Sequence, residues 1–348
     1  MNTFWKAKRV LLTGHTGFKG SWLALWLNTL GAEVFGFSLN ADYRFFQQLA
    51  LEKEIHHFLG DICNANQLTD LVQSCQPQVV IHLAAQPLVR QSYREPLLTW
   101  QTNVMGTLNL LEALRPLKNL CAVVIATTDK VYDNKEWVYG YRENDPLGGK
   151  DPYSSSKAAS EIAIASWRHS FFGGQSPIKI ATARAGNVIG GGDWAEDRIV
   201  PDIVRALSSQ KTIRVRNPNS VRPWQHVLEP LSGYMKLARV LYETESETIQ
   251  GAFNFGPGTD AFRPVTDLVN ETLKHWPGFW ENESDSNAPH EAGLLSLAIE
   301  KANAHLGWKP KWGFQKSVEK TILWYRETHS GASPRKCTLD QIQEFSGS

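Results

Sequence analysis

A glycine-rich turn between a short apolar strand and a helix is the feature of this sequence that most constrains the fold. Residues Arg9–Thr13 predict a buried strand, and Gly14, Gly17 and Gly20 then follow at G-x-x-G-x-x-G spacing. Apolar residues at helical spacing predict a helix over Gly20–Leu30. Glycine permits the tight turn and a close approach of the backbone to a pyrophosphate, which the helix N-terminus then faces. The turn therefore predicts a dinucleotide site.

Several side chains around this turn are further candidates for the cofactor. The turn itself contributes His15, Phe18 and Lys19, and the two basic residues either meet phosphate charge or are simply solvated. Asp61, with Ile62 beside it, ends a later strand and can accept a hydrogen bond from an adenine amino group or cap a helix.

The prediction of the cofactor site also includes the residue that binds the adenosine ribose and the residues at the end of the fourth strand. The acid that usually binds the ribose has no obvious counterpart, because Ser38 ends the second strand and Asp42 follows only later. The choice between NAD and NADP is therefore open at this point. Small residues at Ala84 and Ala85, followed by Gln86, let the backbone lie against the cofactor.

Short apolar strands alternate with helices through the first half of the chain, which predicts βαβ units and a parallel sheet. We expect a doubly wound α/β sheet of six or seven strands, the Rossmann arrangement, over residues 1–188. Residues 189–348 predict a smaller α/β region that mainly binds substrate, with some segments returning to the first domain. Within it we expect a hinge at Gly190–Gly192, an exposed loop at Glu281–Asn287 and poor order from Thr328 to Leu339.

Composition excludes several classes of function. The formal net charge of +1 over 348 residues gives no compositional support for binding nucleic acid or a membrane surface. No segment has the roughly 18 uninterrupted apolar residues of a membrane helix, and the N-terminus lacks a signal-peptide pattern. The four cysteines form no C-x-x-C pair, so we expect neither a metal site nor disulfides, and a reducing cytoplasm suits them.

The catalytic candidates follow the strand at 122–126. Tyr153 and Lys157 form a Y-x-x-x-K motif, whose i, i+4 spacing puts both side chains on one face of a helix. A nearby ammonium favours tyrosinate, so Tyr153 can exchange a proton with a sugar hydroxyl near neutral pH. The motif alone is common, but it follows the glycine-rich turn at a suitable distance and a strand ending in Thr127 and Thr128.

Together these motifs resemble the extended short-chain dehydrogenase/reductase family over roughly residues 7–325, with Asn103 as a further matching position. The resemblance implies a bound NAD and a nucleotide-diphosphate sugar as substrate. It also implies that Thr127, Thr128, Tyr153 and Lys157 surround the nicotinamide and the sugar hydroxyl that is oxidised. By the same resemblance, two helices near Leu98–Leu114 and Ser154–Phe171 would form the interface of a homodimer, with a homotetramer as the alternative.

Asp129 and Lys130 narrow the resemblance to the CDP-glucose 4,6-dehydratases, a subgroup in which an acid–base pair occupies these positions. Elimination of water across C5 and C6 needs a base for the C5 proton and an acid for the leaving C6 hydroxyl. We assign Lys130 as the base and Asp129 as the acid, although the sequence leaves the reverse assignment open. Lys130 must then act without its proton and Asp129 with one, and the assignment fails if the two residues form a plain ion pair. The structural alternative is an ordinary Asp-Lys turn on the surface.

The substrate candidates lie in the second region. Arg198, Arg214 and Arg222 can offer planar donor forks to a diphosphate, and Asn187 matches a family position that contacts the sugar phosphate. Each arginine is otherwise a solvated surface residue. By resemblance, the substrate is CDP-glucose and the product enters 3,6-dideoxyhexose synthesis for the O-antigen of a bacterial lipopolysaccharide.

Other functions are compatible with the same scaffold. A nucleotide-sugar 4-epimerase or reductase is the main alternative, and Asp129 and Lys130 argue against it. A non-catalytic dinucleotide sensor is disfavoured by the intact Tyr153 and Lys157.

Overall fold

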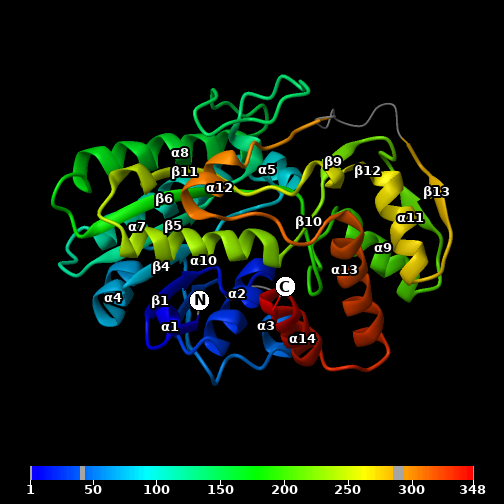
Figure 1. Cartoon of the computed structure of the whole chain (residues 1–348), viewed down its shortest axis with the longest axis horizontal. Coiled ribbons are helices and arrows are strands. Elements are labelled where there is room, and N and C mark those ends of the chain that lie inside the picture. Colours follow the sequence, from blue (N-terminus) through cyan, green and yellow to red (C-terminus); the bar gives the residue numbers. More distant parts are fainter. Residues whose placement is uncertain (1, 40–43, 285–293, 348) are drawn as a thin grey trace.

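The computed structural model describes residues 2–39, 44–284 and 294–347, and a seven-stranded parallel sheet is the central element of this part (Figure 1). Its strands are β1 (Arg9–Thr13), β2 (Glu33–Ser38), β3 (His56–Leu59), β4 (Val79–His82), β5 (Cys121–Ala126), β6 (Ile178–Arg184) and β11 (Gly251–Asn254). Their spatial order is β11-β6-β5-β4-β1-β2-β3. The chain thus builds outward from β1 to β3 and then reverses to start again at β4, which confirms the predicted doubly wound fold.

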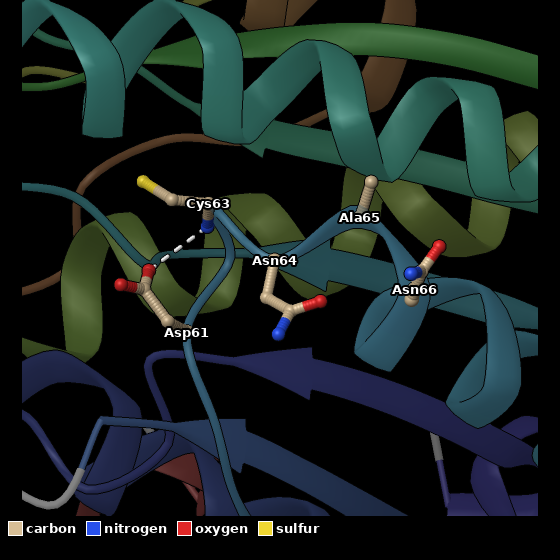
Figure 2. Close-up of a pocket in the computed structure, with 5 residues that line it drawn as sticks. All are labelled: Asp61, Cys63, Asn64, Ala65 and Asn66. Carbon is tan, nitrogen blue, oxygen red and sulfur yellow. Dashed lines mark hydrogen bonds between the residues drawn. The ribbon is translucent and has the colours of Figure 1, made fainter.

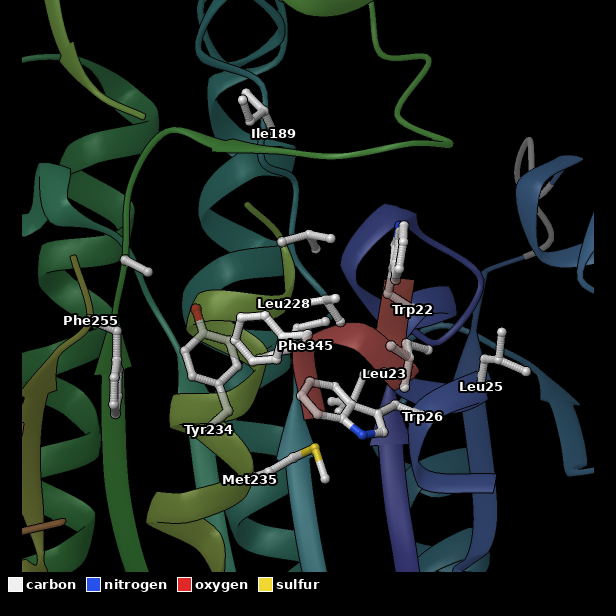
Figure 3. Packing of buried hydrophobic residues seen from close by; sticks show 14 of the residues in the cluster. Trp22, Leu23, Leu25, Trp26, Ile189, Leu228, Tyr234, Met235, Phe255 and Phe345 are labelled. Atoms are coloured by element: carbon white, nitrogen blue, oxygen red, sulfur yellow. The ribbon is translucent and has the colours of Figure 1, made fainter. Parts of the chain in front are cut away.

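Strand residues alternate between two cores, one on each face of the sheet. Val10 and Leu12 of β1 face the larger core, whereas Leu11 between them faces the smaller one. The larger core packs against α2 (Phe18–Thr29), α10 (Leu228–Glu243) and α14 (Pro334–Gly347). Figure 3 shows how Trp26 of α2, Met235 of α10 and Phe345 of α14 fill it. The smaller core packs against α4 (Ala65–Cys75), α7 (Gly106–Leu114) and α8 (Pro152–Phe171).

The second region consists of small sheets and helices at one side of the main sheet (Figure 1). Three strand pairs are formed there: β7 (Val188–Ile189) with β10 (Gln225–His226), β9 (Val221–Pro223) with β12 (Phe262–Pro264), and β8 (Ile213–Val215) with β13 (Trp280–Asn282). Its helices are α9 (Ile199–Ser208), α11 (Val265–His275) and α13 (Phe314–His329). In contrast, β11 and α10 return to the main sheet and complete its packing.

The other elements are short and lie mainly between the sheet strands. The helices are α1 (Asn2–Trp5), α3 (Arg44–Gln48), α5 (Val89–Arg94), α6 (Pro96–Trp100) and α12 (Glu300–Leu306). Single 3₁₀ turns cover Asp129–Val131, Glu247–Ile249 and Thr259–Ala261, and a π-helical turn covers Gln101–Met105. In the described part of the chain, no helix combines the length and the apolar character needed to cross a membrane.

A π-helical turn over Gln101–Met105 leads directly into α7, and this turn carries Asn103 into the interior. Two local expectations need correction. Gly191 is packed rather than a hinge, because a Cβ there would lie 2.0 Å from the Trp324 ring. The expected poorly ordered tail contains α14, whose apolar residues complete the larger core.

The expected exposed loop at 281–287 is also only partly a loop. Glu281 and Asn282 belong to β13 and pair with β8, so backbone hydrogen bonding overrides the polar composition of the segment. Residues 285–287 lie outside the described residues. So does Asp42, the distant candidate for the ribose.

Candidate active site

The glycine-rich turn forms a cradle that side chains could not enter. Gly14 has φ +74°, and a Cβ on it would lie 2.7 Å from the backbone nitrogen of Ala84 at the end of β4. A Cβ on Gly20 would lie 2.0 Å from the carbonyl oxygen of Gly14. α2 begins at Phe18, and its N-cap Gly17 offers no side-chain cap to the first-turn N–H groups. Free N–H groups at a helix N-terminus bind anions, so the cradle fits the pyrophosphate of a dinucleotide.

His15 is buried in the turn. Its Nε2 lies 2.6 Å from Nδ1 of His57 on β3, and Gly36 on β2 provides the space for its ring. Burial, and then the neighbouring His57, lowers the pKa of His15 to about 3, so the ring is neutral at physiological pH. The expectation that His15 is solvated is therefore wrong, because its side chain is buried, whereas its contact with a phosphate stays a prediction.

Lys19, at the start of α2, extends toward the middle of the site. Its Nζ lies 5.8 Å from the centre of the Tyr234 ring on α10. Burial, and then the charge of Arg198, lowers the pKa of Lys19 to about 8, while Asp129 opposes this shift. A cation at a helix N-terminus beside another cation is unfavourable without an anion. Lys19 is therefore placed to meet a negative ligand group.

An open pocket of about 480 Å³ lies beyond the end of β3, and Figure 2 shows its lining of Asp61, Cys63, Asn64, Ala65 and Asn66. One carboxylate oxygen of Asp61 accepts the backbone N–H of Cys63 at 2.8 Å. The Asp61 carboxylate keeps acceptor capacity for an amino group. Ile62, in contrast, is buried in the smaller core, so only its backbone can face a ligand.

The segment after β4 is held by reciprocal amide contacts. Asn103 Oδ1 accepts the backbone N–H of Gln86 at 2.8 Å, and Asn103 Nδ2 donates to the Gln86 carbonyl at 3.1 Å. Asn103 Nδ2 also donates to Ser156 Oγ on α8 at 2.9 Å. Asn103 is fully buried, so it links the backbone that follows Ala84 and Ala85 to the helix of the Y-x-x-x-K motif.

Tyr153 and Lys157 lie in the first turns of α8, close to the end of β5. Asp151 caps this helix by accepting the backbone N–H of Ser154 at 2.9 Å. Burial raises the pKa of Tyr153, against the opposing effects of the Lys130 charge and of a hydrogen bond with Thr128. Lys157 Nζ donates to the carbonyl of Ala126 at 3.3 Å, and burial lowers the pKa of Lys157 to about 8. The site thus holds a buried phenol beside an ammonium that can titrate near neutral pH.

Asp129 and Lys130 follow at the end of β5 in the 3₁₀ turn capped by Thr128. Lys130 Nζ lies 3.4 Å from Asp129 Oδ1, and Thr128 Oγ1 donates to the same oxygen at 3.0 Å. The carboxylate is buried, its Oδ2 has no hydrogen-bond partner among the residues that the structure describes, and Gly186 leaves just enough room for it. The two residues therefore form an ion pair, and the roles of Lys130 as base and Asp129 as acid fail unless a proton first passes from Lys130 to Asp129.

The four residues predicted to bind substrate differ in their distance from the catalytic cluster. Arg198 borders the catalytic cluster, since its charge acts on both Lys19 and Tyr153, and its Nη1 lies 2.8 Å from Asp193 Oδ2. Arg222 lies on β9, and Asn187, with φ +39°, follows β6. Arg214 is exposed on β8 and pairs with Glu283 at 3.0 Å, so the structure does not bring it to the cluster.

Sequence reasoning missed two arginines near this side of the site. Arg90 on α5 and Arg216 after β8 both contact Oδ1 of Asp197, at 2.9 and 3.2 Å. Their shared partner comes from a third segment, so no spacing in the sequence connects them. They join the first domain to the segment that carries Arg198.

Comparison with known proteins agrees with this geometry. The family model described as GDP-mannose 4,6 dehydratase matches residues 11–321. A curated CDP-glucose 4,6-dehydratase from Salmonella typhimurium is 45% identical, and the match covers 98% of this chain and 97% of that protein.

Solved structures show the same fold. The UDP-glucose 4-epimerase of Thermus thermophilus in complex with NAD has a TM-score of 0.79 at 25% identity, covering 91% of this chain and 98% of that chain. A dTDP-glucose 4,6-dehydratase from Bacillus anthracis in complex with NAD has a TM-score of 0.78 at 21% identity, covering 94% of this chain and 100% of that chain.

Proposed function

The chain belongs to the family described as GDP-mannose 4,6 dehydratase, within the extended short-chain dehydrogenases/reductases, and we propose that it converts CDP-D-glucose to CDP-4-dehydro-6-deoxy-D-glucose. The reaction is a hydro-lyase reaction, with oxidation at C4, loss of water across C5 and C6, and reduction at C6. One observation carries this proposal. Thr128, Asp129 and Lys130 adjoin Tyr153 and Lys157 at the carboxyl end of β5, so redox and elimination groups share one site.

NAD is the cofactor that we propose for this site. The cradle of Gly14, Gly17 and Gly20 would hold the pyrophosphate, and Asp61 would accept from the adenine amino group. When bound, NAD supplies the redox chemistry, taking up hydride from C4 and returning it at C6.

Tyr153 is the proposed base for the C4 hydroxyl. Its phenol has to lose a proton inside a buried site, where burial alone raises its pKa. Lys157, one turn later on the same face, stabilises the phenolate, and Thr128 hydrogen-bonds the phenol oxygen. Tyr153 then accepts the C4 hydroxyl proton as the C4 carbonyl forms.

Lys130 and Asp129 are the proposed C5 base and C6 acid. Their ion pair is compatible with these roles because one proton transfer from Lys130 to Asp129 yields a neutral amine and a carboxylic acid. In that form the amine removes the C5 proton, which the C4 ketone has made acidic, and the acid protonates the leaving C6 hydroxyl. Lys130 then returns its proton to C5. The proton that Tyr153 took from the C4 hydroxyl passes back to the Lys130–Asp129 pair, which restores the site for the next cycle.

The substrate diphosphate is proposed to bind Arg198 and Arg222, with Asn187 at the sugar-phosphate end. We further propose a functional division at residue 188, with cofactor and catalysis in the first domain and substrate binding mainly in the second. Support comes from the location of Arg198 and Arg222 in the second region. Some of its segments return to the first domain, as β11 does by pairing with β6.

A homodimer through α8 and the helices before α7 is proposed from exposed apolar side chains. Leu97, Met105 and Ile162 are 84%, 51% and 62% exposed, and Leu98 and Phe171 are a little less than half exposed. Apolar side chains exposed together on neighbouring helices are typical of an interface. Replacing Leu97 and Ile162 by Asp should give a folded monomer in light scattering, and an unchanged mass would contradict the proposed dimer.

Location and pathway are further proposals. The free thiols of Cys63, Cys75, Cys121 and Cys337 suit a reducing cytoplasm. We propose that the 4-dehydro-6-deoxy product enters 3,6-dideoxyhexose synthesis for a lipopolysaccharide O-antigen.

The activity is tested by incubating the protein with CDP-glucose and NAD and recording the product mass. Loss of one water without net NADH supports the proposal. An unchanged mass from folded, NAD-loaded protein overturns it and favours a 4-epimerase, whose product has the mass of the substrate. Asp129→Asn and Lys130→Met then test the two roles, since both should retain C4 oxidation and lose water elimination.

A further inference from the structure

A buried carboxylate that the proposed reaction does not use lies behind the catalytic residues. Glu161 is on α8, one turn beyond Lys157, and is almost fully buried. Its Oε1 accepts from Thr127 Oγ1 at 2.5 Å and from Arg184 Nε at 3.0 Å. Its Oε2 accepts from Thr182 Oγ1 at 2.8 Å and from Arg184 Nη2 at 2.9 Å. Four donors thus fix this carboxylate in one position, which excludes a merely fortuitous burial of charge.

Arg184 extends the contact from Glu161 to the far end of the catalytic segment. Its Nη1 donates to Tyr132 Oη at 2.9 Å, and Tyr132 in turn donates to Asn254 Oδ1 at 2.7 Å. Thr127 is bound directly to Glu161, and Tyr132 is bound to it through Arg184. These two residues flank the segment that carries Asp129 and Lys130. One buried ion pair therefore holds both ends of that segment against α8.

Lys157 is the cation that faces this carboxylate. Its Nζ has a hydrogen bond to the Ala126 carbonyl, and the i, i+4 spacing puts Glu161 on the same face of α8. Burial lowers the pKa of Lys157, and the charge of Glu161 opposes that shift. For Glu161 itself, burial raises the pKa, but Arg184 and the hydroxyl donors outweigh it, so the pKa of Glu161 is lowered overall. The carboxylate is thus a permanent anion next to the ammonium that serves Tyr153.

We propose that Glu161 is a positioning residue that keeps the charged lysine–tyrosinate form of the Lys157–Tyr153 pair populated and fixes the segment from Thr127 to Tyr132. The proposal deepens the function proposed above and rests on it for its kinetic test. Glu161 contacts neither of the reacting atoms and acts through Lys157 and Thr127.

The expected pH dependence follows from the two forms of the Lys157–Tyr153 pair that have no net charge. Lysine–tyrosinate and neutral lysine–tyrosine carry the same net charge, so pH does not alter their ratio, whereas a nearby anion favours the form with the charged lysine. Removing the Glu161 carboxylate therefore lowers the plateau of kcat/KM in the rate–pH profile. It also makes the fully protonated Lys157–Tyr153 pair lose its first proton more easily, so the acid limb, the part of the profile where kcat/KM falls as the pH is lowered, moves to lower pH. A purely structural defect lowers the plateau and leaves the limb where it was.

Other charges around Lys157 do not reverse this direction. The charges of Glu161 on α8, His82 on β4 and Lys19 on α2 interact with that of Lys157, and Tyr153 lies one turn before Lys157 on α8. Arg184 on β6 faces Glu161. Burial, and then Lys157, lowers the pKa of His82 to about 3, so His82 is neutral. Without Glu161 the uncompensated Arg184 disfavours the ammonium further, which adds to the expected shift.

The test compares Glu161→Gln with wild type, with Glu161→Asp and Thr182→Val as controls. Glu161→Gln should lower the plateau of kcat/KM at least about tenfold and move the acid limb down by at least about one pH unit, because an opposite charge at this spacing moves a pKa by about 1 to 3. Glu161→Asp and Thr182→Val keep the anion, so their acid limb should coincide with that of wild type. A limb that stays in place in folded Glu161→Gln overturns the proposal.

A second readout does not depend on the substrate. The ionisation of Tyr153 is followed by tyrosinate absorbance of the NAD-loaded protein, with Tyr153→Phe as the blank. Glu161→Gln should show less tyrosinate near neutral pH, and an unchanged signal overturns the inference whatever the enzyme acts on. If CDP-glucose is not dehydrated while the tyrosinate signal falls as expected, the proposed function fails and this inference stands. If Glu161→Gln does not fold, Glu161→Gln with Arg184→Met removes both buried charges and should change both readouts in the same direction.

Discussion

Gly186 controls the position of the Asp129 carboxylate, and replacing it by alanine should separate oxidation from water elimination. A Cβ on Gly186 would lie 1.8 Å from Asp129 Oδ2, whereas an ordinary contact begins at 3.4 Å. The carboxylate must therefore retreat by about 1.6 Å, the difference between these distances. That movement breaks its contacts with Thr128 at 3.0 Å and Lys130 at 3.4 Å. A displacement of about 1 Å in a catalytic group can cost about 100-fold in rate, and overpacking costs about 1–3 kcal/mol of stability.

We expect Gly186→Ala to remain folded, to load NAD and to eliminate water at least about 100-fold more slowly than wild type. Oxidation at C4 should persist, so NADH absorbance should build up after substrate is added while the product mass shows little loss of water. Gly256→Ala is the matched control, because Gly256 follows β11 at the same sheet edge and its Cβ would meet Leu297 at an ordinary 3.4 Å. Wild-type water elimination by folded Gly186→Ala would refute Asp129 as the positioned acid.

Three further predictions test the charges of the site and of the core. Lys157→Met should lower kcat/KM at neutral pH by about 100-fold or more, since Tyr153 loses the ammonium that favours its ionisation, and a rate–pH profile like that of wild type would contradict this role. Arg198→Ala should raise the KM for CDP-glucose at least about tenfold, whereas the exposed Arg214→Ala should leave it unchanged, and equal effects in steady-state assays would argue against a diphosphate site at Arg198. Burial raises the pKa of Glu229 to about 7, above its pKa in the unfolded chain. The protonated carboxyl therefore stabilises the folded state fully at a pH below the unfolded-chain pKa, and this contribution is lost as the pH rises through 7. Urea unfolding at pH 5 and pH 8 should therefore show a loss of up to about 3 kcal/mol for wild type that Glu229→Gln lacks, and parallel pH curves would show that Glu229 is ionised when folded.

The sequence predicts those parts of the fold and site that depend on local patterns. The buried strands β1, β4 and β5 are continuous apolar runs, and the turn after β1 has glycine where the backbone approaches Ala84. The spacing of Tyr153 and Lys157 needs only the period of a helix. These features are contained within a few residues each, so a single sequence suffices for them.

The sequence does not predict side-chain directions that depend on distant partners. His15 turns toward His57 because Gly36, on another strand, leaves space for its ring. Lys19, at the start of α2, instead lies near the ring of Tyr234 on α10. His15 and Lys19 are four positions apart but have different surroundings, because their partners come from distant parts of the chain. The local spacing of residues does not predict such contacts.

The charges of the site explain how a chain with a net charge of +1 can bind a doubly charged diphosphate. The charges of Arg198, Lys157 and Asp129 all act on Lys19, and burial lowers the pKa of both lysines to about 8. Cations that are buried together destabilise the free protein, and an anionic ligand relieves that cost when it binds. Affinity for the phosphates therefore comes from local charges held in place by the fold, not from a field of the whole molecule. The same arrangement favours the tyrosinate of Tyr153, so the charges that would retain the substrate also prepare the base that acts on it.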